Sequence, residues 1–144
     1  MKIVYKTIKN IEIEQLNNLY ESISWLDYVR DPSILEKMIL NTRQVFSAWD
    51  KEELVGLARV VGEEAYKVYI QDILVKKDYQ GGKIEYTLLK KALEKNAQIP
   101  QKILLTESSR NVIRYCRKEG FTVSEQEAFG LIINEYSIKK EDTF

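Results

Sequence analysis

Two adjacent glycines, Gly81 and Gly82, separate a strand-like segment at 66–75 from a helix-like segment at 83–95. A helix that begins at such a turn leaves its first backbone N–H groups without partners, and its dipole favours negative charge at the same point. This arrangement suits the binding of a phosphate group. One such junction is a weak signal by itself, because every strand-to-helix turn has it and most hold only water.

The chain contains no histidine, which removes the commonest general base and the commonest metal ligand. A Ser–His–Asp triad and a histidine-ligated zinc site are thereby excluded, and we expect no metal. Acid–base chemistry must use Asp, Glu, Tyr, Cys, Lys or water. The single cysteine, Cys116, excludes an internal disulfide and agrees with a reducing compartment, so we expect a cytoplasmic protein.

Charge and length narrow the possible partners and the number of domains. Lys plus Arg and Asp plus Glu number 22 each, so the overall charge attracts neither nucleic acid nor acidic membranes. The apolar runs are too short to span a bilayer, and the start of the chain lacks the pattern of a secretory signal. With 144 residues, of which 44% are hydrophobic, and no repeat or linker, residues 1–144 are expected to form one domain.

The N-terminal part is predicted to form one strand and two helices. The strand is expected at 3–8. Apolar residues with the spacing of one helical face follow, namely Leu16, Leu19, Tyr20 and Ile23. Asp31 and Pro32 form a helix-start signal, since aspartate caps free N–H groups and proline fits the first helical position. The buried face of this second helix is expected to consist of Ile34, Leu35, Met38 and Ile39.

The remaining segments predict a sheet with helices on both faces. Strands at 43–50, 53–61 and 66–75 have short connections that favour an antiparallel meander. After the helix at 83–95, a buried strand is expected, followed by a helix with a serine start and Gly120 at its end. The ranges are 102–107 for this strand, 108–120 for the helix, and about 121–126 and 130–138 for two closing strands. The fold class is therefore α/β (α+β), with a mixed sheet.

The turn and its flanking strands resemble the GNAT family of acyl-CoA-dependent N-acetyltransferases, whose usual turn reads V-x-P-E-Y-(Q/R)-G-K-G-I-G before a helix containing L-L. The residues that match without a gap are Val75, Asp78, Tyr79, Gln80, Gly81, Ile84, Leu88 and Leu89. The segments "ELVGLARVV" and "YIQDILV" look like the family's third and fourth strands, and "YCRKEGF" like the end of its fourth helix. The resemblance covers essentially the whole chain and implies a GNAT-type, mostly antiparallel central sheet.

The resemblance also implies which residues bind acetyl-CoA as co-substrate. At the turn these are Gln80, Gly81, Gly82, Lys83, Ile84 and Glu85. Splayed backbone groups of the fourth strand pair with the pantetheine arm in the family, and one N–H there can polarise the acetyl carbonyl. By register these groups belong to Ile73, Leu74 and Val75. Ser109 stands where the family often has an asparagine that touches the pantetheine.

Lys83 and Glu85 depart from the family pattern, in which small residues let the backbone approach the diphosphate. A carboxylate near that site would cost about 3 kcal/mol per phosphate charge, at about 6 Å and an effective dielectric of about 20. Lys83 would offset a similar amount. In the alternative, Glu85 caps its own helix and points away from the mouth of the turn.

Acetyl transfer to an amine needs a base for the nitrogen and an acid for the departing thiolate. Gln71 and Asp72 occupy the place where related acetyltransferases often show an acidic pair. Gln71 cannot accept a proton and is assigned to the substrate side. Asp72 is the candidate base, directly or through water, or it holds a cationic amine. The alternation of side chains along a strand places Asp72 on one face with Val68, Ile70 and Leu74. The alternative to a role in catalysis is a carboxylate that is hydrogen-bonded within the sheet.

For the acid, the family usually places a tyrosine four residues before its Gly-Phe pair. That position holds Cys116 here, and Tyr115 lies one residue earlier. A thiol matches the reference pKa of the departing thiol, about 8.5, but a lone cysteine on an apolar helical face is usually a core residue. Tyr115 requires the helix to shift, because each helical residue turns about 100°. Cys116, Tyr115 and solvent remain the alternatives.

Trp25 and Tyr28 flank Asp27 in a segment that resembles the family's acceptor-side wall. An aromatic pair beside a carboxylate can hold an alkylammonium group. In the alternative, the two rings pack the N-terminal helices together. The acceptor amine itself is not identified by the sequence.

We therefore expect an N-acetyltransferase that moves the acetyl group of acetyl-CoA directly to an amine of a small molecule or protein, without a covalent enzyme intermediate. The alternative is a catalytically silent module of the same fold that binds or senses acyl-CoA. The residues that favour this alternative are Gln71, Lys83, Glu85 and Cys116. Exposed edge strands near the C-terminus offer a route to a homodimer.

Overall fold

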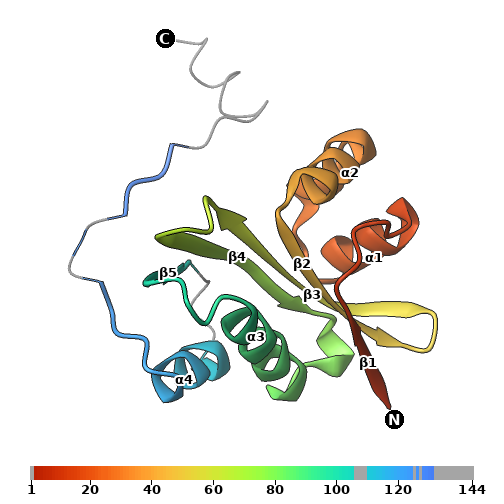
Figure 1. Cartoon of the computed structure of the whole chain (residues 1–144). Coiled ribbons are helices and arrows are strands. Elements are labelled where there is room, and N and C mark those ends of the chain that lie inside the picture. Colours follow the sequence, from red (N-terminus) through yellow and green to blue (C-terminus); the bar gives the residue numbers. More distant parts are fainter. Residues whose placement is uncertain (1, 106–109, 125, 127, 132–144) are drawn as a thin grey trace, which may run out of the picture.

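The computed structural model describes residues 2–105, 110–124, 126 and 128–131. Five strands form one sheet in the order β1-β2-β3-β4-β5 (Figure 1). Their bounds are Ile3–Lys6 (β1), Gln44–Asp50 (β2), Glu53–Gly62 (β3), Lys67–Val75 (β4) and Gln101–Leu104 (β5). Neighbouring strands are antiparallel except β4 and β5, which run parallel. The expected meander and the mixed, mostly antiparallel sheet are confirmed.

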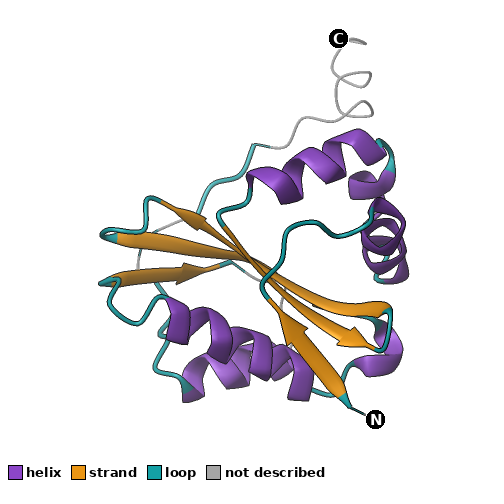
Figure 2. Ribbon diagram, turned by 45° about the vertical axis from the view of Figure 1, so that its right-hand side comes forward, coloured by secondary structure: helices purple, strands orange, loops and turns teal. Residues whose placement is uncertain are grey.

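Helices cover both faces of this sheet, as the sequence predicts (Figure 2). One face carries α1 (Ile13–Ser22), the 3-10 turn η1 (Leu26–Val29) and α2 (Pro32–Asn41). The other carries α3 (Lys83–Lys95) and α4 (Arg110–Lys118). A second 3-10 turn, η2 (Lys77–Tyr79), connects β4 to α3. The bounds of α3 agree with the predicted helix.

A separate hydrophobic core fills each space between helices and sheet. The core beneath α3 and α4 includes Val55, Ala58, Ile70, Val75, Ile84, Leu88 and Cys116. The core beneath α1 and α2 includes Leu16, Leu19, Tyr20, Leu35, Leu57 and Leu74. A polar contact closes the first core at the end of α3, where Gln44 and Asn96 exchange two side-chain hydrogen bonds of 3.0 and 2.7 Å.

The start of α2 and the end of α4 follow their sequence signals. The Ser33 N–H donates to Asp31 Oδ1 at 3.0 Å, and Pro32 is the first helical residue. Hydrogen bonds from the Ser33 hydroxyl and N–H lower the pKa of Asp31. Gly120 follows α4 with a φ of 95°, in the left-handed region that glycine tolerates. Both helix boundaries therefore come from local chemistry.

The buried face of α2 is narrower than expected. Leu35 and Ile39 are buried and Met38 is partly buried, but Ile34 is exposed. Consecutive helical residues are turned by about 100°, so a helix lying on the outside of the layer cannot bury both Ile34 and Leu35 fully. The prediction that Ile34 belongs to the core is wrong.

A β-bulge overturns the alternation expected for Asp72. Arg59 pairs with Asp72, whereas the next β3 residue pairs with Ile70, so Gln71 is an extra residue in β4. Val68 and Ile70 lie in the core beneath α3, but the Asp72 carboxylate bonds to α1 on the other face. Asp72 therefore shares a face with Leu74 and not with Val68 or Ile70.

The C-terminal prediction fails within the described residues. The strand expected at 102–107 is short, ends at Leu104 and is only partly buried; residues 106 and 107 lie outside the described ranges. Residues 121–124, 126 and 128–131 form no strand, and the apolar residues among them that are exposed are Val123, Phe129 and Leu131. Because these side chains are exposed, no described element packs against them to stabilise a strand. The other residues of the two closing strands lie outside the described ranges.

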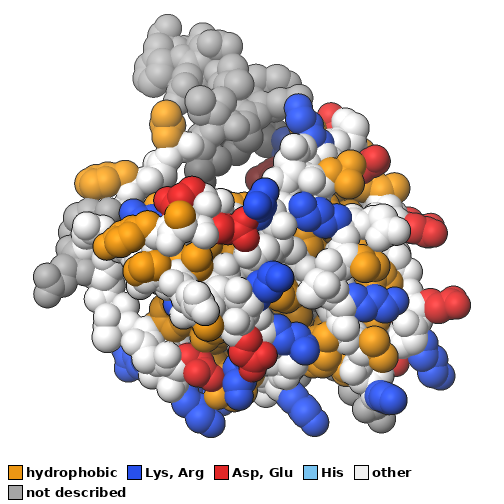
Figure 3. Space-filling model, viewed as in Figure 1, with side chains coloured by type: hydrophobic (Ala, Val, Ile, Leu, Met, Phe, Trp, Pro, Cys, Tyr) orange, Lys and Arg blue, Asp and Glu red, His pale blue; other side chains and the backbone are white. Residues whose placement is uncertain are grey.

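Surface charge and helix length concern two partners that the sequence does not predict, nucleic acid and membranes. Basic and acidic side chains are interspersed on the face of the molecule shown in Figure 3, without a continuous region of one sign. Among the helices of the described ranges, none combines the length and the apolar character required to cross a bilayer.

Gly56 tests the close packing of α3 on the sheet. A Cβ at this position would lie 3.0 Å from Ile84 Cγ2 and 3.3 Å from both Ala48 Cβ and Leu88 Cδ1. Overpacking of this kind costs about 1–3 kcal/mol, so Gly56→Ala should lower the free energy of unfolding in urea by about that amount. Gly130→Ala is the control, because its Cβ would meet nothing within 4 Å. Equal stability of the two variants would contradict this packing.

Candidate active site

The turn between β4 and α3 has the geometry of an anion site. The Gln80 side-chain amide donates to the carbonyl of the last β4 residue at 2.9 Å, which folds the turn against the strand end. Gly81 and Gly82 have φ values of 150° and 104°, and Gly82 precedes α3 in the left-handed conformation. The Tyr86 N–H bonds to the Gly82 carbonyl at 2.9 Å. The N–H groups of residues 83–85 therefore open toward the turn.

Tyr115 of α4 lies over this turn. A Cβ on Gly82 would overlap the Tyr115 hydroxyl and lie 2.7 Å from Tyr115 Cζ. The Tyr115 ring stacks on Tyr86 of α3, with centroids 4.7 Å apart and planes inclined by 13°. The Tyr86 hydroxyl donates to Glu119 Oε1 at 2.8 Å, which raises the pKa of Tyr86. Glycine at position 82 is thus required both by backbone conformation and by the adjacent ring.

Glu85 is buried in the first turn of α3. The residue is 8% exposed, and its Oε1 has no hydrogen-bond partner among the described residues. Glu85 makes no hydrogen bond to a described residue, so the capping hydrogen bond of the alternative is not formed. The direction in which its carboxylate points relative to the turn stays a prediction. A buried carboxylate oxygen without a hydrogen-bond donor is energetically unfavourable. This oxygen belongs to the first turn of α3, next to the N–H groups that suit an anion. Lys83, in contrast, is exposed.

The second half of β4 has the open edge that the resemblance implies. Pairing with β5 covers Lys67–Ile70 and ends opposite Leu104. The Leu105 N–H still reaches the Ile70 carbonyl at 3.4 Å. Ile73, Leu74 and Val75 lie beyond this point, pair with β3 on one side and, within the described residues, have no strand on the other. An extended ligand can pair with such an edge.

Asp72 lies in a buried ion pair on the face of β4 that is covered by α1 and α2. Its Oδ2 accepts from Arg59 Nε at 2.6 Å and from the Tyr20 hydroxyl at 3.1 Å. Arg59 Nη1 donates to Thr42 Oγ1 at 3.0 Å. Arg59 and Asp72 are each 6% exposed. The carboxylate is therefore bonded within the sheet, and Oδ1 is the oxygen that makes no hydrogen bond to a described residue.

Tyr20 connects this ion pair to an aromatic cluster. Tyr28 stacks on Tyr20 with centroids 4.9 Å apart, and Trp25 stacks on Tyr28 at 5.6 Å. Burial, and after it the charge of Asp72, raises the pKa of both tyrosines. Trp25 and Tyr28 thus pack against Tyr20 of α1, which is one of the two helices that the packing alternative joins. Tyr28 keeps 37% exposure, and its role in substrate binding stays a prediction.

The remaining residues predicted for the site are Cys116, Gln71 and Ser109. Cys116 is 7% exposed in the core beneath α3 and α4, and burial raises the pKa of its thiol. Gln71 forms the bulge and is exposed. Ser109 lies outside the described residues. The structure therefore brings Tyr115 to the turn and Asp72 to the aromatic cluster, while Cys116 belongs to the packing.

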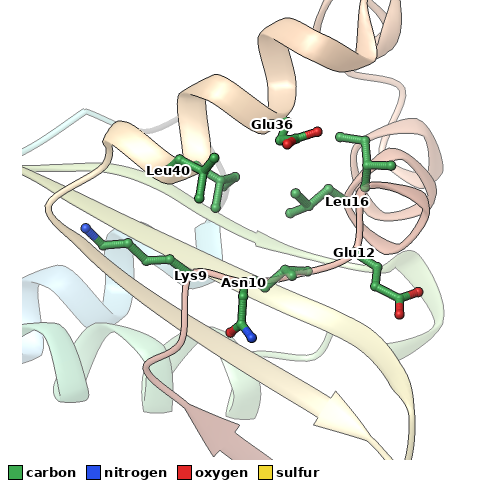
Figure 4. Close-up of a pocket in the computed structure, with 9 residues that line it drawn as sticks. Lys9, Asn10, Glu12, Leu16, Glu36 and Leu40 are labelled. Carbon is green, nitrogen blue, oxygen red and sulfur yellow. The ribbon is translucent and has the colours of Figure 1, made fainter.

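A cavity of about 240 Å³ lies elsewhere, between residues 9–13 and α2 (Figure 4). Its apolar lining residues are Ile11, Ile13, Leu16, Ile39 and Leu40, and its polar ones are Lys9, Asn10, Glu12 and Glu36. No site residue predicted from the sequence lines this cavity. Within the described residues, no group of three or more His, Cys, Asp or Glu side chains is placed to hold a metal ion.

Sequence reasoning missed two contacts of the site. Arg59 interrupts the apolar run "LVGLARVV", and a charge inside a buried strand needs a partner, so its pairing with Asp72 had a readable signal. Tyr86 had no comparable signal, because its ring partner Tyr115 lies on another helix and only the packing of the two helices joins them.

The family model described as "Acetyltransferase (GNAT) domain" matches residues 14–137. The chain belongs to the GNAT acetyltransferase family. It is 32% identical over 130 residues to the uncharacterised N-acetyltransferase ycf52 of Porphyra purpurea, covering 84% of this chain and 71% of that protein. The ycf52 protein of Pyropia yezoensis is 25% identical over 130 residues, covering 83% and 73%.

Solved GNAT structures agree with this fold. A GNAT-family acetyltransferase of Streptococcus pneumoniae superposes with a TM-score of 0.74 at 29% identity, covering 93% of this chain and 99% of that one. An aminoglycoside acetyltransferase from an uncultured soil metagenome, solved with sisomicin, has a TM-score of 0.67 at 16% identity, covering 92% and 97%. The second likeness shows the fold alone.

The buried ion pair predicts a large effect of Asp72→Asn on stability. The substitution keeps the side chain's shape but leaves the Arg59 charge uncompensated, which costs about 3–5 kcal/mol in buried pairs. Urea unfolding measures the loss. Asp27→Asn is the matched control, because Asp27 is 69% exposed at 3.5 Å from Arg30, and surface pairs contribute about 0–1 kcal/mol. Similar losses in both variants would speak against a buried pair.

The packing of Cys116 predicts a poorly reactive thiol. Burial restricts access and raises the thiol pKa, and the thiolate is the form that reacts. Ellman's reagent at pH 8 should therefore modify the folded protein much more slowly than the protein unfolded in urea. Equal rates in the two states would show that Cys116 is accessible and would restore it as a candidate acid.

Proposed function

We propose that this member of the family transfers an acetyl group from acetyl-CoA to an amine of a small molecule or protein, directly and without a covalent enzyme intermediate. The observation that carries the proposal is the position of the α3 turn beside the open edge of β4, where Ile73–Val75 lead through η2 into Gln80–Glu85. Family membership supports acetyl transfer, and GNAT acetyltransferases generally use acetyl-CoA.

The turn fits the diphosphate of acetyl-CoA. The N–H groups of residues 83–85 and the dipole of α3 favour an anion there. A Cβ on Gly81 would meet nothing within 4 Å, so open space adjoins the turn at Gly81. Glu85 opposes anion binding, since its buried charge is poorly screened, and the exposed Lys83 compensates in part.

The open edge of β4 fits the pantetheine arm. Its backbone groups would hydrogen-bond the arm as a neighbouring strand does, and an N–H among residues 73–75 would polarise the acetyl carbonyl. When bound, acetyl-CoA supplies a thioester, an acyl group already activated toward an amine.

Asp72 is assigned to the amine. Arg59 and Tyr20 both bond to its Oδ2, so Oδ1 is the atom that would accept a hydrogen bond from the amine or from a water molecule. The amine then loses its proton to Asp72, directly or through that water. Since Arg59 balances the charge of Asp72, the exposed part of Tyr28 and the Trp25 ring would supply further attraction for an alkylammonium group. The departing thiolate takes its proton from solvent.

The competing function is a catalytically silent module that binds acyl-CoA. The buried Glu85 carboxylate in the first turn of α3 and the core position of Cys116 favour it. Both functions require the cofactor to bind, but only the transferase releases its thiol in the presence of an amine.

Thiol release separates these two functions. The protein, incubated with acetyl-CoA and a panel of alkylamines, polyamines, aminoglycosides and lysine peptides, should release free thiol with at least one of them. Calorimetric titration with acetyl-CoA measures binding in parallel. Binding without release on any amine would favour the silent module, and absence of binding would contradict both functions.

Glu85 predicts an unusual gain of function. Removing one negative charge at about 6 Å from a diphosphate is worth at most about 3 kcal/mol per phosphate charge at an effective dielectric of about 20. Glu85→Gln keeps the shape of the side chain and should lower the Kd for acetyl-CoA severalfold in calorimetry. Glu94→Gln is the control, because Glu94 is exposed in the last turn of the same helix. Unchanged or weaker binding in Glu85→Gln would show that this carboxylate does not face the cofactor.

A further inference from the structure

The Tyr115 hydroxyl lies at the entrance of the α3 turn. It occupies the space that a side chain on Gly82 would need, directly before the helix. The N–H groups that begin α3 belong to the next residues, 83–85, so an anion held by them lies close to this hydroxyl. Tyr115 therefore reaches from α4 to the position where the proposed function places the diphosphate.

The Tyr115 ring is held by its neighbours, and its hydroxyl is not used by them. Tyr86 stacks on the ring at 4.7 Å and is itself fixed by its hydrogen bond to Glu119. Lys90 and Lys118 place their ammonium groups 5.5 and 5.3 Å from the Tyr86 ring centroid. The Tyr115 hydroxyl makes no hydrogen bond to a described residue. A fixed donor without a partner is therefore present at the turn.

This position separates Tyr115 from the reacting atoms. The diphosphate and the thioester stand at opposite ends of the pantetheine arm. A hydroxyl placed at the diphosphate end cannot protonate a sulfur at the other end. With the diphosphate at the turn, as proposed, the role as general acid that the family resemblance suggests for a tyrosine on this helix does not fit the position of Tyr115.

We infer that Tyr115 is a positioning residue for the cofactor, whose hydroxyl donates a hydrogen bond to the diphosphate of acetyl-CoA. The inference rests on the proposed function, because it requires acetyl-CoA to bind at the turn. Tyr86 holds the ring in place, and Gly82 leaves the space that the hydroxyl occupies. The hydrogen bond supplements the backbone donors of α3 at a site where Glu85 opposes the anion.

Tyr115→Phe tests the inference, because it keeps the ring stack and removes only the hydroxyl. A hydrogen bond to a charged group contributes enough to change affinity by about tenfold. We expect the Kd and KM for acetyl-CoA to rise by about that factor, with kcat and its pH profile unchanged. With S-acetylpantetheine, which lacks the diphosphate, kcat/KM should equal that of the unmodified protein. Tyr66→Phe, an exposed position, is the matched control.

Each other outcome has a definite meaning. A fall in kcat with a displaced alkaline limb of the pH profile would restore Tyr115 as the acid and overturn the inference. An unchanged Kd, or an equal loss with S-acetylpantetheine, would overturn it as well. A lower unfolding temperature of the unliganded Tyr115→Phe protein, with the affinity loss recovered on cooling, would assign the effect to packing. If the unmodified protein binds no acetyl-CoA, the proposed function fails first.

Discussion

The buried ion pair between Arg59 and Asp72 is the constraint on which the arrangement of the site depends. Two charges removed from water must face each other at hydrogen-bond distance, and here they lie on neighbouring strands. Tyr20 and Thr42 extend the pair to α1 and to the end of α2. The register of β3 and β4 is thereby fixed at one point, and Gln71 is left as an extra, bulged residue.

After the bulge, the two faces of β4 contact different parts of the proposed site. Asp72 turns toward α1, α2 and the aromatic cluster, while Ile73 and Val75 contribute to the side covered by α3. The strand then leads into the turn whose N–H groups suit an anion. One strand therefore separates the proposed acceptor side from the proposed cofactor side. The stacked pair Tyr86 and Tyr115 fixes α4 against this turn.

Local signals in the sequence predicted much of this fold. The period of α3, the Asp31–Pro32 start of α2 and Gly120 after α4 each depend on neighbours in the chain, and all are found. The strand meander and the residues of the turn indicated the GNAT family. The features that the sequence did not predict depend on contacts between residues that are distant in the chain. The bulge at Gln71 reversed the expected face of Asp72, and it follows from pairing with a distant arginine.

The same distinction holds for the candidate site. The turn residues were found because their types and spacing are local, whereas the position of the Tyr115 hydroxyl depends on how α4 packs against α3. Helical geometry showed that Tyr115 and Cys116 face different directions, but not which would meet the cofactor. The closing strands predicted at about 121–126 and 130–138 were wrong within the described residues, where Val123, Phe129 and Leu131 are exposed and form no strand.

A crystal structure with acetyl-CoA tests the central claim most directly. The account predicts the diphosphate within hydrogen-bond distance of the N–H groups of residues 83–85, with the pantetheine arm along Ile73–Val75. A diphosphate bound elsewhere, or a turn filled by the Glu85 carboxylate, would contradict it.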